Sequence, residues 1–137
     1  MNIYKLKISP EHLDLMGHMN HVTYLRLMEE ARWDLYNNLG YTKENIQEDG
    51  KGPIVLGVNI KYRKEIVLNE NIIIKSECSN YSGLLGKMTQ VIFKENGVIA
   101  ATAEVTFGYF DLINRKLLLP SGKWFSIHKE LMNGAEK

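Results

Sequence analysis

The longest periodic pattern in the chain is helical, and it follows a polar loop over residues 11–20. Apolar residues recur at helical spacing at Tyr24, Met28, Ala31, Leu35 and Leu39, and Leu25, Leu27 and Tyr36 widen this stripe. Asn37, Asn38 and Gly40 are typical of a helix end. The pattern predicts one long amphipathic helix, which at about 1.5 Å per residue runs along most of a small domain.

Alternating apolar and polar residues, typical of strands, precede and follow this helix. The alternation covers residues 2–8, closed by Pro10, and recurs over 58–63, 72–78, 88–93 and 99–109. Asn96-Gly97 predicts a tight type I′ hairpin, because both central positions of that turn take positive φ. Shorter elements are predicted as a helical turn over 42–49, a strand over 116–118, and a helix from a Ser121 cap to about Met132.

The order of these elements predicts an α+β fold: a strand, a long helix, and then four or five antiparallel strands. A sheet with one apolar face needs a cover, and the helix laid across that face supplies it. The chain has 137 residues, 45% of them hydrophobic and 24% charged. These values suit one globular domain, which we expect to span residues 1–137.

Charge and hydropathy exclude several classes of partner. Seventeen Lys and Arg against sixteen Asp and Glu give a net charge of +1, so no overall field attracts nucleic acid or an anionic membrane. No apolar run approaches the roughly 20 residues of a membrane span, and residues 1–10 lack the apolar block of a signal peptide. The lone cysteine, Cys78, cannot form an internal disulfide and is expected in the core rather than as a nucleophile. We therefore expect a cytoplasmic protein.

The candidate chemistry lies where the polar loop enters the long helix. This segment reads Asp14-Leu-Met-Gly17-His18-Met-Asn20-His21-Val-Thr-Tyr24. The free N–H groups of the helix start, near His21 and Val22, carry a partial positive charge and suit an oxyanion formed at an attacked carbonyl. Asp14 is positioned to act there as nucleophile or as general base for water. The structural alternative is that Asp14 only caps the helix or forms an Asx turn.

This segment resembles the entry motif of the 4-hydroxybenzoyl-CoA thioesterase family of hotdog proteins. In that motif an acidic residue precedes Gly-His-x-Asn, followed by Tyr-Leu and Glu-x-Ala-Arg. The stretches 62–64, 68–70 and 96–109 are similar to later parts of the family pattern, so the resemblance covers about residues 5–120. It implies a single hotdog domain, with an antiparallel sheet wrapped around one long central helix. It also implies hydrolysis of acyl thioesters, with acyl-CoA as the expected substrate and acyl carrier protein as the alternative carrier.

The resemblance also implies roles for individual residues. It places the catalytic carboxylate at Asp14 and the polarising amide at about His21. His18 and His21 are further catalytic candidates, because a histidine can pass a proton to the leaving thiolate near neutral pH. Packing within the loop is the alternative for His18. The candidates for substrate binding are Gly17, Asn20, Tyr24, Arg63 and Lys64, of which Asn20 is expected to cap the helix rather than react.

Several other polar residues have both a functional and a structural interpretation. Arg63, Lys64 and Lys87 are candidates for the phosphates of coenzyme A, or are simply solvated. The Gly-Leu-Leu-Gly loop over 83–86 either approaches a pantetheine arm or only connects two strands. Arg32 falls within the apolar stripe and is expected to pair with Glu29, although a carboxylate on this helix is the general base in a second branch of hotdog thioesterases.

Neither a metal nor a cofactor is expected, because His12, His18 and His21 lack a metal-binding spacing. Two other functions remain open: a non-catalytic module that binds acyl-CoA or acyl carrier protein, and, with little support, a dehydratase. The resemblance further implies a homodimer or homotetramer with the ligand tunnel at the subunit boundary. Trp33 agrees with an interface, since it is expected on the less apolar, exposed side of the helix.

Overall fold

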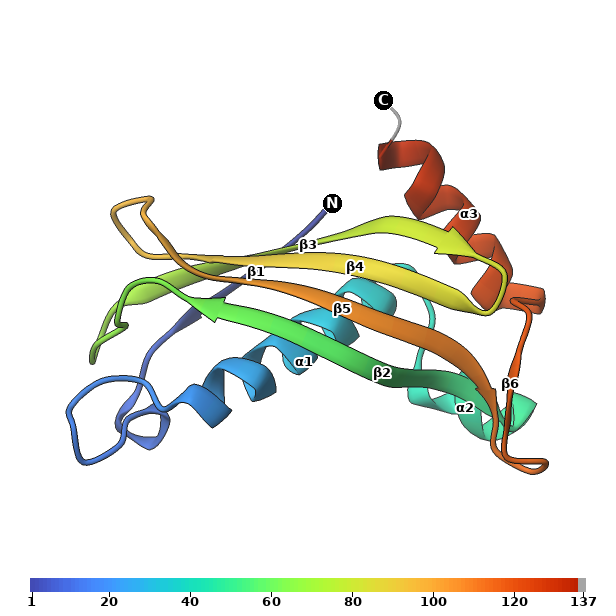
Figure 1. The fold of residues 1–137 in the computed structure, drawn as a ribbon, viewed down its shortest axis with the longest axis horizontal. Coiled ribbons are helices and arrows are strands. Elements are labelled where there is room, and N and C mark those ends of the chain that lie inside the picture. The colour runs from blue at the N-terminus through green and yellow to red at the C-terminus, as the bar shows by residue number, and fades with distance from the viewer. Residues whose placement is uncertain (136–137) are drawn as a thin grey trace.

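A computed structural model describes residues 1–135 (Figure 1). In chain order the elements are β1 (Asn2–Lys7), a 3₁₀ turn η1 (Pro10–His12), α1 (His21–Asn38), α2 (Lys43–Asp49), β2 (Lys51–Tyr62), β3 (Asn71–Ser82), β4 (Leu85–Phe93), β5 (Ile99–Asp111), β6 (Lys116–Leu118) and α3 (Gly122–Ala135). The predicted strands, central helix and terminal helix all form. The last two residues of the predicted domain lie outside the described residues.

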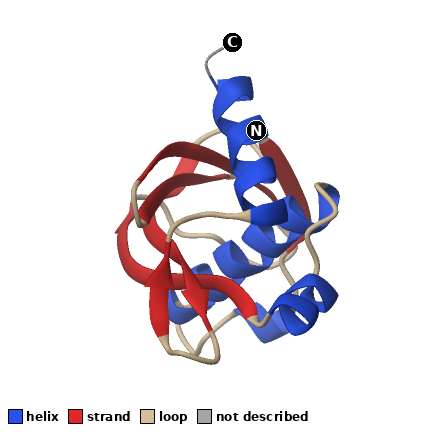
Figure 2. Cartoon of the chain, turned by 90° about the vertical axis from the view of Figure 1, so that its right-hand side faces the viewer, coloured by secondary structure: helices blue, strands red, loops and turns tan. Residues whose placement is uncertain are grey.

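The strands form one antiparallel sheet in the order β1-β3-β4-β5-β2, with β6 beside β5. The sheet curves around α1, which runs across its inner face, while α3 covers one end (Figures 1 and 2). This arrangement confirms the predicted α+β fold, an antiparallel sheet wrapped around one long central helix. Within the described residues, no helix is long and apolar enough to cross a membrane.

Local signals set both ends of α1. The Asn20 side chain caps the N-terminus by accepting a hydrogen bond of 2.8 Å from the Val22 N–H, as the sequence predicted. At the C-terminus, Gly40 takes a φ of +79°. The N–H of Tyr41 then donates to Tyr36 O and that of Gly40 to Asn37 O, which together form a Schellman motif. The predicted stripe is buried, except that Leu25 is exposed and Leu39 is half-buried.

A polar network separates the two halves of the core beneath α1. Arg32 Nη1 donates to Gln90 Oε1 at 2.9 Å, and Gln90 Nε2 donates to Met28 O and to Ser76 Oγ. Gln90 and Ser76 are fully buried, and burial lowers the pKa of Arg32. The predicted ion pair between Arg32 and Glu29 is wrong, because no described carboxylate lies within 4.0 Å of the guanidinium. Gln90 does not neutralise the charge of Arg32, but its side-chain oxygen accepts a hydrogen bond from one guanidinium N–H group.

Aromatic side chains fill the half of the core next to α3. Trp124 is fully buried and stacks on Tyr109, with ring centroids 5.5 Å apart, and its Nε1 donates to Tyr81 Oη at 2.9 Å. His128 packs against Trp124 with ring centroids 4.0 Å apart. Its Nδ1 must donate to the Trp124 carbonyl oxygen at 2.9 Å, which leaves Nε2 to accept from the Tyr36 hydroxyl at 3.4 Å. The folded protein therefore favours the neutral form of the His128 imidazole.

This buried histidine predicts a loss of stability in mild acid. Burial lowers the pKa of His128 to about 4, from an ordinary value of 6.5. The unfolded chain therefore binds a proton that the folded chain rejects between these pH values. Stability is complete above pH 6.5 and falls as pH drops toward 4, by about 2 kcal/mol between pH 7 and pH 5. Urea unfolding at both pH values should show a smaller difference for His128→Gln than for the wild type; equal differences would contradict this prediction.

Three local predictions need correction. The hairpin at Asn96-Gly97 forms, but only Gly97 has positive φ, because the turn is closed one residue earlier by the Gly97 N–H and Lys94 O. The turn is therefore not type I′. Trp33 is half-buried against the aromatic core rather than exposed, with its ring centroid 6.3 Å from that of Tyr36. Val58 of the edge strand β2 is exposed although its alternation predicted a buried face.

Candidate active site

The loop before α1 holds Asp14 in a tight turn. The Gly17 N–H donates to Asp14 O at 3.1 Å, and Gly17 takes the positive φ that the turn requires. The Met16 N–H donates to Asp14 Oδ1 at 2.8 Å, which is the Asx turn proposed as the structural alternative. The Asp14 N–H donates to His18 O at 3.1 Å. No described residue donates a hydrogen bond to Oδ2, so the turn anchors one carboxylate oxygen and leaves the other available.

Asp14 and the start of α1 border the same pocket, of about 340 Å³. Its lining residues are Asp14, His18, Met19, His21, Tyr24, Tyr62, Arg63, Lys64 and Glu65. The pocket thus brings together six of the eight predicted site residues, from the loop, the helix and the end of β2. The other two, Gly17 and Asn20, do not line it. Gly17 shapes the turn and Asn20 caps the helix.

The first turn of α1 leaves one backbone donor free. The Asn20 cap accepts from the Val22 N–H, and the Thr23 N–H donates to Asn20 O at 2.9 Å. No described residue accepts from the His21 N–H, which is the first of the helix. The helix dipole adds a partial positive charge at this position. Among the described residues, the helix N-terminus therefore presents one free N–H, that of His21.

The two predicted histidines differ in their surroundings. His18 is half-buried, with its Nδ1 3.6 Å from Glu65 Oε2, and its backbone forms a bridge with Val67. The His21 side chain is exposed and makes no described hydrogen bond. His21 is therefore free to reorient toward a ligand, whereas His18 is held beside a carboxylate.

Two basic residues line the side of the pocket formed by the segment after β2. Arg63 and Lys64 are exposed and follow β2 directly, and both backbone N–H groups donate to Ala100 O, at 2.8 and 3.1 Å. Lys87 does not belong with them, because it lies on the sheet face 3.4 Å from Glu104 and does not line the pocket. The glycine loop at 83–86 is also absent from the lining of this pocket; it connects β3 to β4, and Gly83 lines a separate pocket beside α3.

The sequence interpretation missed three residues of this pocket, namely Met19, Tyr62 and Glu65. Tyr62 and Glu65 flank the predicted pair Arg63 and Lys64, and a shared position at the end of one strand was the available signal. Cys78 is buried in β3, where burial raises the pKa of its thiol to about 11, as expected for a core residue. Within residues 1–135, no three His, Cys, Asp or Glu side chains are grouped so as to hold a metal.

An antiparallel sheet wrapped around one long central helix is the hotdog fold. The model of the thioesterase-like superfamily matches residues 8–131, and the chain belongs to this family. The predicted family and enzyme class are thereby confirmed. Over 124 residues the chain is 36% identical to the long-chain acyl-CoA thioesterase FadM of Escherichia coli strain K12, a match covering 87% of this chain and 90% of that protein.

Solved structures agree with this assignment. The crystal structure of YbaW, a probable thioesterase from Escherichia coli, matches with a TM-score of 0.84 and 30% identity, covering 96% of this chain and 99% of that one. The protein SAV2348 from Staphylococcus aureus, solved in complex with CoA, matches with a TM-score of 0.90 over 96% of this chain and 83% of its own. At 14% identity, SAV2348 shows likeness of fold alone.

Proposed function

We propose that this protein hydrolyses acyl-CoA thioesters to the free acid and coenzyme A. One observation carries the proposal: Asp14 and His21, whose backbone N–H has no described acceptor, line the same pocket. Thioester hydrolysis needs a group that delivers an oxygen nucleophile to the carbonyl carbon and a donor that stabilises the resulting oxyanion. The activity recorded in the name of the relative FadM supports this assignment.

The His21 N–H is the proposed oxyanion donor. It receives the thioester carbonyl oxygen and polarises the C=O bond before attack. Its hydrogen bond strengthens as negative charge develops on that oxygen, which lowers the barrier rather than merely binding the substrate. The helix dipole acts in the same direction. A backbone donor serves whatever the side chain, so this role does not depend on the His21 imidazole.

Asp14 supplies the attacking oxygen in one of two ways. As a general base, it takes a proton from water while the water oxygen bonds to the acyl carbon. As a nucleophile, its own oxygen forms a mixed anhydride, which water then hydrolyses. In both routes the carbon–sulfur bond breaks and the thiolate leaves with the bonding electron pair. His18 or His21 is proposed to supply the proton that converts this thiolate to free coenzyme A.

Arg63 and Lys64 are proposed to hold the phosphates of coenzyme A. Both are exposed, and both border the pocket on the side of β2. Phosphate groups favour such cations, and the net charge of +1 makes this local pair important for attracting an anionic substrate. Tyr24 lines the same pocket and is proposed to contact the substrate near the thioester. Acyl carrier protein is the alternative carrier, because its prosthetic group presents the same thioester arm.

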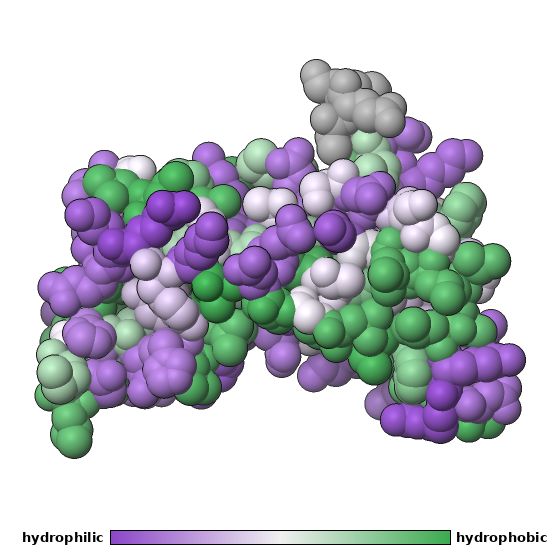
Figure 3. All heavy atoms as spheres, in the orientation of Figure 1, coloured by the Kyte–Doolittle hydropathy of each residue, from purple (hydrophilic) through white to green (hydrophobic). Residues whose placement is uncertain are grey.

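We propose that the protein works as a homo-oligomer, a homodimer or a homotetramer. The strand β2 lies at the edge of the sheet, and its residues Val55, Leu56 and Val58 are exposed. Figure 3 shows apolar side chains gathered at the right-hand end of the molecule, where β2, β5 and β6 lie. An edge strand with exposed apolar residues is suited to cover by another copy.

Thiol release from a panel of acyl-CoAs tests the proposed function. The panel should contain aromatic acyl groups and aliphatic groups from short to long, each supplied at several concentrations to wild-type protein. We expect hydrolysis of at least one class, with a rate that saturates. Saturable binding without release of thiol would contradict hydrolysis and favour an acyl-CoA binding module. Activity on acyl carrier protein alone would correct the carrier while keeping the reaction.

A further inference from the structure

Two tyrosines join the first turn of α1 to the end of β2. Tyr62, the last residue of β2, donates from its hydroxyl to His21 O at 3.2 Å. Tyr24, in α1, donates in the opposite direction to Lys64 O at 3.4 Å. Their rings pack edge to face, with centroids 4.9 Å apart and planes at 84°. The helix start and the strand end are therefore linked by two bonds and one aromatic contact.

The loop that leads into α1 is held by its backbone to the segment after β2, where the Met19 N–H donates to Ile66 O at 2.8 Å. The helix packs against β1 and β3, whereas Val22 and Leu25 on its first turns and Val58 on β2 are exposed. Helix ends lack intrahelical hydrogen bonds and fray readily. Among the described side chains, the hydroxyls of Tyr24 and Tyr62 alone join the first turn of α1 to the end of β2 by hydrogen bonds. Loss of the Tyr62 hydroxyl would leave the His21 carbonyl, and through its Cα the N–H of the same residue, less well positioned.

The strand end that Tyr62 belongs to is itself well held. The N–H groups of Arg63 and Lys64 both donate to the carbonyl oxygen of Ala100, a residue of the long strand β5. Along β2, Tyr62 pairs with Ala101 and Lys61 with Thr102. Tyr62 therefore extends from a part of the sheet fixed by backbone hydrogen bonds. The hydrogen bond from its hydroxyl connects this fixed part of the sheet to His21, the residue at the start of α1 whose N–H has no described acceptor.

We propose that Tyr62 is a positioning residue, which holds the carbonyl of His21 and thereby aims the N–H of the same residue into the pocket. The inference rests on the proposed function, because it assigns that N–H to the oxyanion. Displacing an oxyanion donor by a fraction of a hydrogen-bond length weakens its hydrogen bond to the substrate oxygen. The weakening is greatest in the transition state, where that oxygen carries the most negative charge. Loss of the Tyr62 hydroxyl should therefore lower kcat and leave KM nearly unchanged.

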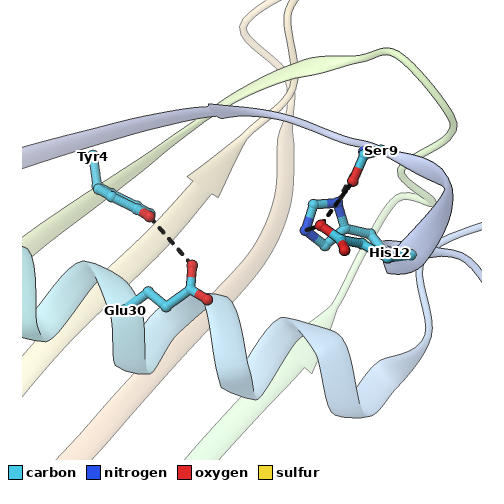
Figure 4. A network of polar contacts seen from close by, with 5 residues as sticks. Tyr4, Ser9, His12 and Glu30 are labelled. Atoms are coloured by element: carbon cyan, nitrogen blue, oxygen red, sulfur yellow. Dashed lines mark hydrogen bonds and ion pairs between the residues drawn. The ribbon is translucent and has the colours of Figure 1, made fainter.

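The experiment compares Tyr62→Phe with Tyr4→Phe on the acyl-CoA that the wild type hydrolyses best. Tyr4 is a matched control, because its hydroxyl also bonds α1, donating to Glu30 Oε2 at 3.2 Å, far from the helix start (Figure 4). Both variants lose one hydroxyl and keep the ring. We expect Tyr62→Phe to lower kcat about tenfold with KM within about twofold of wild type. Tyr4→Phe should keep both constants, and unfolding midpoints should change equally little in the two variants.

The outcomes separate this inference from the proposed function. An active wild type whose kcat survives Tyr62→Phe would overturn the positioning role and leave the function standing. A rise in KM at constant kcat would also overturn it, because the 46% exposed ring of Tyr62 would then be contacting substrate. Equal losses of kcat in both tyrosine variants would indicate general loosening of α1 and would count against it. A wild type that hydrolyses no thioester removes the proposed function and, with it, this inference.

Discussion

Replacement of Asp14 by asparagine is expected to lower kcat about a thousandfold, the largest effect that we predict. The amide is a poor nucleophile and cannot accept a proton from water. Asparagine keeps an oxygen at the position of Oδ1, so the hydrogen bond from the Met16 N–H and the turn around Gly17 should survive. The loss should therefore fall on the chemical step, with only a small change in KM.

Thiol-release kinetics of Asp14→Asn, beside circular dichroism and an unfolding midpoint, measure this prediction. Asp49→Asn is the matched control, because this variant makes the same chemical change at an exposed position in α2, outside the pocket. We expect the control to retain wild-type kcat. Asp14→Asn with more than a tenth of wild-type kcat would restrict Asp14 to its role in the turn. The carboxylate of Glu65, which borders the same pocket, would then be the next candidate to replace.

Replacement of Gln90 by leucine is expected to lower the free energy of unfolding by about 3 kcal/mol. Leucine is similar in volume but accepts and donates no hydrogen bond. The change would leave the Arg32 guanidinium without its 2.9 Å acceptor and the Met28 carbonyl without the donor at 2.9 Å. Ser76 Oγ would lose its donor as well. A desolvated charge without a partner accounts for most of the expected cost.

Urea unfolding at pH 7 should measure this loss against Gln47→Leu, the same replacement at an exposed position in α2, which should change stability by less than about 0.5 kcal/mol. The double variant Arg32→Met/Gln90→Leu adds a second test. Because it removes the charge together with its acceptor, it should be more stable than Gln90→Leu alone. A double variant less stable than Gln90→Leu would mean that Arg32 stabilises the fold by packing rather than through Gln90.

The features that could be predicted from the sequence depend on contacts close along the chain. The turn at Asp14, the cap at Asn20 and the end of α1 at Gly40 each rest on hydrogen bonds between residues no more than five positions apart. Such hydrogen bonds form within the segment itself, so they do not depend on where the segment lies in the fold. The alternation of the strands likewise follows from the backbone itself. The loop motif therefore identified both the carboxylate and the helix N-terminus of the candidate site.

The remaining features depend on partners distant in sequence. Tyr62 bonds a residue 41 positions earlier, and Arg32 bonds Gln90 58 positions later, so the nearby Glu29 was a misleading choice. Trp33 was expected to be exposed because the helical pattern does not show that its ring packs against the aromatic cluster of the core. His128 is neutral only because the fold buries it among aromatic rings.

The sequence by itself thus determined the α+β fold, the order of its elements and the local shape of the loop that carries Asp14. The tertiary structure alone decided which strand faces the start of α1, which cations border the pocket and what satisfies the buried arginine. The physical reason is the range of the interactions. Propensity, capping and turn chemistry act over a few residues, whereas packing and desolvation depend on side chains that only the complete fold brings into contact.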